Sequence, residues 1–103
     1  MKVIIDKKVH QSIENFYKAA MRNHPSLSSQ TFEDKKNRLY DAIEDLRFNH
    51  RIYPKARMKQ EWIDAGWQEC ICEDFHFAYE SGYDQSGEEV VYVYDAVHSL
   101  LYY

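Results

Sequence analysis

Apolar positions recur at spacings of three and four along the first half of the chain, which is the pattern of amphipathic helices. Residues 7–23 follow it first, after Asp6, a residue suited to cap a helix N-terminus. Residues 24–29 break the pattern with Pro25 and three serines. Residues 30–48 then resume it, and we expect the two helices to form a hairpin. Their apolar stripes are Val9, Ile13, Phe16, Tyr17, Ala20 and Met21, then Phe32, Leu39, Ile43 and Leu46.

The second half of the chain changes to alternation of apolar and polar residues, which indicates β-strands. We expect a tight turn at Glu73-Asp74 and a loop over 82–87, so that the last three strands form a meander. The run 88–95 is β-branched and aromatic, as in a central strand. The expected strands are residues 2–5, 67–73, 75–80 and 88–95. The fold class predicted is therefore α+β, with the short first strand and the helix hairpin packed on a C-terminal antiparallel sheet.

The segment that joins the helices to the later strands is ambiguous. Pro54 ends any helical continuation, and residues 55–66 fit either an extended strand or a loop with a helical turn around Glu61-Trp62-Ile63. The sequence contains no internal repeat and no linker-like segment. We therefore expect residues 1–103 to form a single domain.

Composition narrows the class of protein. The chain has 103 residues, and its nine Tyr, five Phe and two Trp are expected to supply much of a small core. The apolar run Val3-Ile4-Ile5 is too short for a signal core or a membrane span, which predicts a cytoplasmic protein without membrane contact.

The two cysteines, Cys70 and Cys72, are expected to be reduced thiols. Residues two apart on a strand do not have the geometry of a disulfide. A metal site would need a second ligand pair at suitable spacing, and the sequence does not offer one. We therefore expect neither a metal nor a cofactor.

Positive charge is concentrated in one segment. The net charge of −4 argues against non-specific nucleic-acid binding, yet residues 47–59 hold five basic side chains and His50 without any acid. Lys55, Arg57 and Lys59 alternate, so an extended segment would present them together as phosphate ligands, with Arg51 nearby. A solvated edge strand, protected from pairing by its charges, explains the same pattern.

The order of these elements, together with two strand sequences, resembles the RelE/ParE toxin superfamily over nearly the whole chain. The two sequences are Asp-Phe-His-Phe-Ala-Tyr at 74–79 and Val-Tyr-Asp-Ala-Val-His-Ser-Leu-Leu-Tyr-Tyr at 93–103. The resemblance implies the toxin of a type II toxin–antitoxin pair, restrained by a cognate antitoxin. Such a toxin cleaves messenger RNA on the ribosome or, in the ParE branch, acts on DNA gyrase.

Several positions depart from the pattern of the family's ribonucleases. His76 stands where the family usually has Arg on a central strand, and Gln68 and Glu69 stand where the RelE branch has lysines. At the C-terminal site, where the family has Arg or His and then Tyr, this chain has His98 and Tyr102. The resemblance implies that these residues share proton transfer and phosphate binding.

RNA cleavage through the 2′-hydroxyl requires a base, an acid and positive charge near the phosphorus. Histidine suits the first two roles because its pKa lies near neutrality. We therefore expect His76 and His98 to converge at one end of the sheet as catalytic residues, with Tyr102 orienting the phosphate and Glu69 as a reserve base. Two hypotheses remain open at this stage: an endoribonuclease, or a non-catalytic binding protein of the same fold in which these are ordinary half-exposed side chains.

Overall fold

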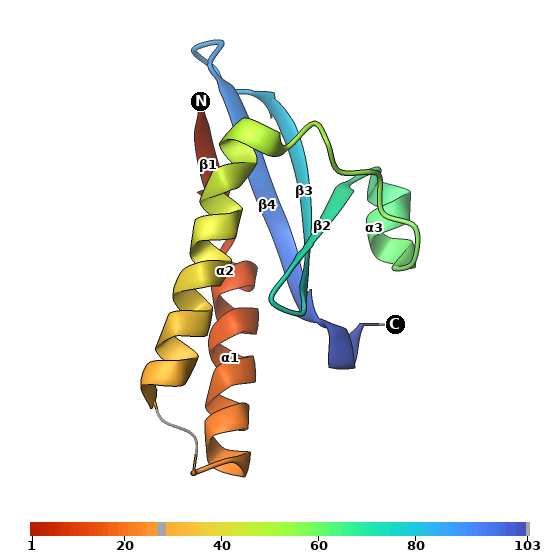
Figure 1. Cartoon of the computed structure of the whole chain (residues 1–103). Coiled ribbons are helices and arrows are strands. Elements are labelled where there is room, and N and C mark those ends of the chain that lie inside the picture. Colours follow the sequence, from red (N-terminus) through yellow and green to blue (C-terminus); the bar gives the residue numbers. More distant parts are fainter. Residues whose placement is uncertain (27–28, 103) are drawn as a thin grey trace.

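The computed structural model describes residues 1–26 and 29–102. A strand and two helices are followed by a short third helix and three strands (Figure 1). The elements are β1 (Lys2–Ile5), α1 (Lys7–Asn23), α2 (Ser29–Asn49), α3 (Gln60–Ala65), β2 (Gln68–Cys72), β3 (Phe75–Tyr83), β4 (Glu89–His98) and the 3-10 turn η1 (Ser99–Leu101). The predicted α+β class is confirmed.

One sheet of four strands organises the molecule, in the order β1-β4-β3-β2. Strands β2, β3 and β4 form the predicted antiparallel meander. Strand β1 pairs in parallel with β4, so the sheet is mixed and β4 is internal. Helices α1 and α2 run side by side along the sheet, and α3 lies apart from them, near β2 and the C-terminus (Figure 1).

The main core lies between the two long helices and one face of the sheet. Phe75, Phe77 and Tyr79 alternate along β3 and are fully buried on this face. Burying such a side chain contributes about 1.5–3 kcal/mol each. The apolar stripes of the helices meet them through Val9, Ile13, Tyr17, Phe32, Leu39, Ile43 and Leu46. At the start of α1, the Asp6 side chain accepts a hydrogen bond from the Lys8 amide at 2.9 Å, as an N-cap does.

The opposite face of the sheet carries a second, smaller core built around Trp62 of α3. This indole is fully buried with Ala56 and Ala78, and its Nε1 donates to the Asp95 carboxylate at 2.9 Å. The extended strand and the helical turn predicted as alternatives for residues 55–66 are both present in part. Lys55 forms a β-bridge with Gln68, and the chain then turns into α3, which ends at the left-handed Gly66.

The hairpin between β2 and β3 closes through two residues in the left-handed region. Glu73 has φ 49° and Asp74 has φ 69°, and Cys72 pairs with Phe75 directly beside them. Positive φ at both central residues matches the twist of the strands in a two-residue turn. The predicted tight turn is confirmed.

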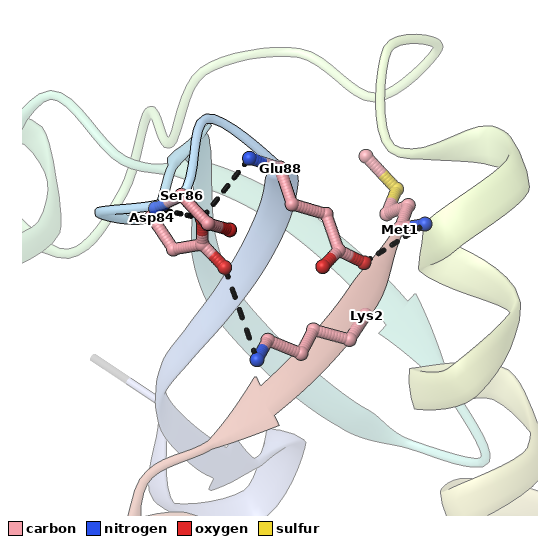
Figure 2. A network of polar contacts seen from close by, with 5 residues as sticks. All are labelled: Met1, Lys2, Asp84, Ser86 and Glu88. Atoms are coloured by element: carbon pink, nitrogen blue, oxygen red, sulfur yellow. Dashed lines mark hydrogen bonds and ion pairs between the residues drawn. The ribbon is translucent and has the colours of Figure 1, made fainter.

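The loop between β3 and β4 is held by one carboxylate (Figure 2). Asp84 accepts hydrogen bonds from the Ser86 hydroxyl at 2.7 Å and the Glu88 amide at 3.0 Å. These hydrogen bonds lower the pKa of Asp84, and the bond from the Ser86 hydroxyl has the largest effect. Lys2 approaches the same carboxylate at 3.8 Å, and the Met1 amino group lies 3.5 Å from Glu88 (Figure 2). The start of β1 is thereby held against this loop.

Candidate functional site

Four polar side chains meet on the sheet face opposite the long helices, and we call them the polar cluster: Glu69, His76, Ser99 and Tyr102. His76 lies on the face opposite Phe75 and Phe77, as the alternation of β3 predicts. Its Nδ1 lies 2.8 Å from the Glu69 carboxylate on the neighbouring strand. Because Ile71 pairs with His76 and Glu69 pairs with Ala78, the carboxylate reaches the imidazole diagonally across the ladder.

Tyr102 covers the imidazole from the C-terminal turn. The two rings are stacked, with 3.9 Å between centroids and 6° between planes. The phenol donates to the second oxygen of Glu69 at 2.7 Å. Burial, together with the Glu69 carboxylate, raises the pKa of Tyr102 to about 12. The phenol therefore keeps its proton at neutral pH and acts there as a donor.

Ser99 is a member of the cluster that the sequence reasoning missed. Its hydroxyl oxygen lies 3.1 Å from His76 Nε2, and the hydroxyl lies 2.8 Å from the carbonyl oxygen of Asp74. Ser99 lies beyond the end of β4, so strand alternation carries no information about where its side chain points. The only signal in the sequence is that a serine directly follows His98.

The arrangement fixes how the imidazole can act. A carboxylate only accepts hydrogen bonds, so Nδ1 of His76 donates to Glu69, and in the neutral ring Nε2 then carries the lone pair. The Ser99 oxygen lies 3.1 Å from this nitrogen, but its single proton is donated to the Asp74 carbonyl, so Ser99 does not supply a hydrogen bond to the lone pair. Chemically, the cluster offers a base at Nε2, a carboxylate that orients the ring, and a protonated phenol stacked on it.

His98 does not join this cluster, and the predicted convergence of the two histidines is wrong. His76 pairs with Val97, so the next residue, His98, projects from the other face of the sheet. There its ring stacks on Phe16 at 3.8 Å between centroids and meets Phe75 edge-on. Its Nδ1 accepts a hydrogen bond from the Leu100 amide at 3.1 Å. Burial lowers the pKa of His98, which favours the neutral ring that this bond requires.

The basic residues proposed as phosphate ligands are distributed over three places. Lys55 and Arg57 line a cavity of about 400 Å³ together with Glu69 of the polar cluster, and Lys55 Nζ donates to the Gly66 carbonyl at 2.6 Å. Lys59 is the N-cap residue directly before α3, and its Nζ lies 6.0 Å from the centroid of the Trp62 ring. Arg51 pairs at 3.2 Å with Glu89, at the start of β4.

Lys59 also brings the basic segment to the polar cluster. The ring of Trp62, three residues further on, lies 5.7 Å from that of Tyr102 between centroids, and the Lys59 backbone lowers the pKa of the phenol against the larger effect of burial. The segment that supplies Lys55 and Arg57 therefore ends against the same side chain that covers His76. This proximity arises from the fold of residues 55–60 over β2, which the sequence left unresolved.

The thiols are not part of the polar cluster, although Cys70 also lines the cavity beside it. Cys70 is buried in the main core, Cys72 packs against it, and both are free. Burial raises the pKa of Cys70 to about 12. Across residues 1–26 and 29–102 there is no group of three or more His, Cys, Asp or Glu side chains that could hold a metal ion.

No helix within the described part of the chain is long and apolar enough to cross a membrane. Comparison of the sequence with protein-family models and with curated proteins found no match. The polar cluster and the cavity beside it are the features of the fold that bear on function.

Proposed function

We propose that this chain is the toxin of a type II toxin–antitoxin pair and that it cleaves messenger RNA in the cytoplasm through attack of the RNA 2′-hydroxyl. The observation that carries the proposal is the imidazole of His76, held between the Glu69 carboxylate and the Tyr102 ring. The element order, β1-α1-α2 followed by the strand meander, supports the resemblance to RelE/ParE toxins. A cognate antitoxin is the partner implied.

In the proposed reaction, His76 Nε2 removes the proton of the 2′-hydroxyl, and the 2′-oxygen attacks the adjacent phosphorus. The bond from phosphorus to the 5′-oxygen breaks, leaving a 2′,3′-cyclic phosphate and a 5′-hydroxyl. The phenol of Tyr102, protonated at neutral pH, donates the proton that the leaving oxygen requires. Glu69 holds the imidazole and stabilises the imidazolium that forms.

Charge on the phosphate is balanced from the neighbouring cavity. Lys55 and Arg57 line it together with Glu69, so a strand of RNA that crosses the cavity meets two cations beside the polar cluster. Tyr53 in the same wall offers a ring on which a base can stack. His98 has a supporting part only, because its ring fixes the turn that carries Tyr102.

Expression in a bacterial host tests the proposal. The parent protein is expected to arrest growth and to leave cuts in cellular messages that primer extension maps to codons. His76→Asn keeps a polar side chain of similar reach but removes the acid–base group, and both effects should disappear. His24→Gln, a change at an exposed histidine remote from the cluster, is the matched control and should behave like the parent. Codon cuts from His76→Asn at equal protein level would refute the assignment.

A second function is favoured by the burial of the cluster. The side chains of His76 and Glu69 are only 12% and 13% exposed, and they satisfy one another. Such a cluster also suits a non-catalytic binding protein of the same fold, which acts on DNA gyrase or binds only an antitoxin. In that case growth arrest would occur without cuts in messages, or would not occur, and His76→Asn would leave the phenotype unchanged.

A further inference from the structure

The outer edge of β2 is covered over only part of its length. β2 is the last strand of the sheet, and residues 54–56 lie along its first half. The Glu69 amide donates to the Pro54 carbonyl at 3.0 Å, and the Ala56 amide donates to the Trp67 carbonyl at 2.9 Å. The covering segment then leaves toward α3, and the second half of β2 has no such neighbour among the described residues.

The direction of the Ile71 peptide groups follows from this pairing. Hydrogen-bonding groups along a strand point alternately to one side and the other. Since the Glu69 amide points outward to Pro54, the amide and carbonyl of Ile71 point outward as well, away from β3. No described segment pairs with them there. Unpaired strand edges are templates for the addition of another strand.

The surface next to this edge is apolar and hollow. Ile71 is 61% exposed and Met58 is 72% exposed. Both line the cavity of about 400 Å³ with Tyr53 and Pro54. A cavity of this size accommodates a large aliphatic or aromatic side chain from a segment laid along the edge.

Charge identifies the chemistry of the occupant. Lys55 and Arg57 line the same cavity, and residues 47–59 contain five basic side chains and no acid. Within the described chain, Arg57 has no ion pair. Glu69, the one carboxylate in the wall, is engaged by His76 and Tyr102. If a segment laid along this edge placed an apolar side chain in the cavity, carboxylates next to that side chain would contact Lys55 and Arg57.

We infer that the outer edge of β2 at Ile71 is the docking site for an extended acidic peptide segment of a partner protein. The segment adds a strand beside β2, places one bulky apolar side chain in the cavity, and sets its carboxylates against Lys55 and Arg57. Peptide is favoured over RNA because an outward backbone amide and carbonyl in strand geometry match another backbone, while phosphate offers acceptors alone. The docking site does not depend on RNA cleavage, although its occupant would cover two proposed phosphate ligands.

Selection from a random-peptide display library against the folded protein tests this site, with Ile71→Pro as counter-target. Proline removes an outward amide that β3 does not use, so no hydrogen bond between β2 and β3 is lost, and it also replaces the Ile71 side chain. Ile71→Val is the matched control, because it keeps the amide and an apolar side chain. Enriched peptides are expected to alternate acidic and apolar residues. Their affinity should fall about fivefold or more in Ile71→Pro and be nearly unchanged in Ile71→Val.

Arg57→Glu provides a second test that leaves the strand unaltered, and it should weaken the same peptides by about tenfold with a dependence on salt. Hydrogen exchange gives a direct readout: the Ile71 amide should exchange faster than its neighbours in the free protein and become protected when peptide binds. Failure to enrich peptides over the counter-target, or bound peptides that leave this amide unprotected, would overturn the inference. A parallel selection in which only single-stranded RNA oligonucleotides, and no peptides, are enriched would overturn the inference too. Peptide docking with no cuts in messages would instead contradict only the proposed nuclease.

Discussion

The imidazole of His76 and the phenol of Tyr102 lie face to face, 3.9 Å between centroids, and one carboxylate, that of Glu69, bonds to both. His76 belongs to an internal strand, Glu69 to an edge strand and Tyr102 to the C-terminal turn. The contact therefore links the hairpin of β2 and β3 to the C-terminal turn, 33 residues beyond Glu69. Removing the Glu69 carboxylate should therefore change the properties of both rings.

Glu69→Gln should lower the pKa of Tyr102 from about 12 toward the usual value near 10, because the charge that opposes phenolate formation is lost. Ultraviolet titration of tyrosinate, compared with Tyr102→Phe to identify the signal, measures this change. The folded pKa is raised, so the stability it contributes is complete below pH 10 and is lost as pH rises toward 12. An unchanged titration curve in Glu69→Gln would contradict the hydrogen bond.

The stability of the C-terminal turn should fall in mild acid through His98. Burial lowers the pKa of this histidine, opposed by the charge of Asp74 and assisted by His76 and Lys35. The contribution is therefore present above the unfolded value near 6.5 and is lost as pH falls through the folded value. Protonation of Nδ1 also removes the acceptor for the Leu100 amide. The protection of the amides of residues 99–102 against hydrogen exchange, corrected for the intrinsic rate, should fall as the pH drops from about 7 to about 5.

His98→Asn is the control for this effect, since an amide oxygen accepts a backbone hydrogen bond and does not titrate. In this variant, the backbone amides of the C-terminal turn should exchange at rates whose pH dependence reflects only the intrinsic chemistry of exchange. If the variant and the parent lost protection in parallel, another group would be responsible.

Trp62→Phe should destabilise the protein by about 2 kcal/mol, because the buried Asp95 carboxylate loses its indole donor and keeps the hydrogen bond from the Ala96 amide. Asp95 is 5% exposed and accepts from the indole at 2.9 Å, while Lys8 approaches it only at 3.7 Å. Urea unfolding measures the difference. Trp67→Phe is the matched change at a half-buried indole stacked on Tyr94. Trp67→Phe should lower the free energy of unfolding by clearly less. An equal decrease would show that lost packing, and not the lost hydrogen bond, dominates the effect of Trp62→Phe.

The hairpin turn predicts the order of two substitutions at Asp74. This residue has φ 69°, a region that glycine adopts freely and alanine does not. Asp74→Gly should therefore be more stable than Asp74→Ala by about 1 kcal/mol in urea unfolding. Both variants keep the carbonyl that accepts from Ser99. Equal stabilities would mean that the turn relaxes to another conformation.

The two thiols should differ in their reaction with Ellman's reagent. Burial raises the pKa of Cys70 to about 12 and also raises that of Cys72, which is less deeply buried. Since the thiolate is the reactive form, Cys72 should react slowly in the folded protein and Cys70 only after unfolding. Cys72→Ser should abolish the folded-state reaction. Rapid reaction of both thiols would contradict the packing of β2.

Local pattern was sufficient where burial imposes a period on the chain. Spacing predicted α1 and α2 within a residue or two, and the turn at Glu73-Asp74. Alternation also predicted that His76 lies opposite Phe75 and Phe77. It did not predict that β1 would join β4 in parallel, because pairing between distant strands leaves no local period.

The sequence by itself determined the α+β class, the meander and the face of the sheet on which each β3 side chain lies, because 3.6- and 2-residue periods are properties of single elements. Only the tertiary structure decided which side chains meet. Because of the strand register, His98 lies on the sheet face that packs against the long helices, whereas the C-terminal turn places Ser99 and Tyr102 next to His76 on the opposite face. Such contacts depend on strand pairing and on the path of irregular segments, which side-chain periodicity does not encode.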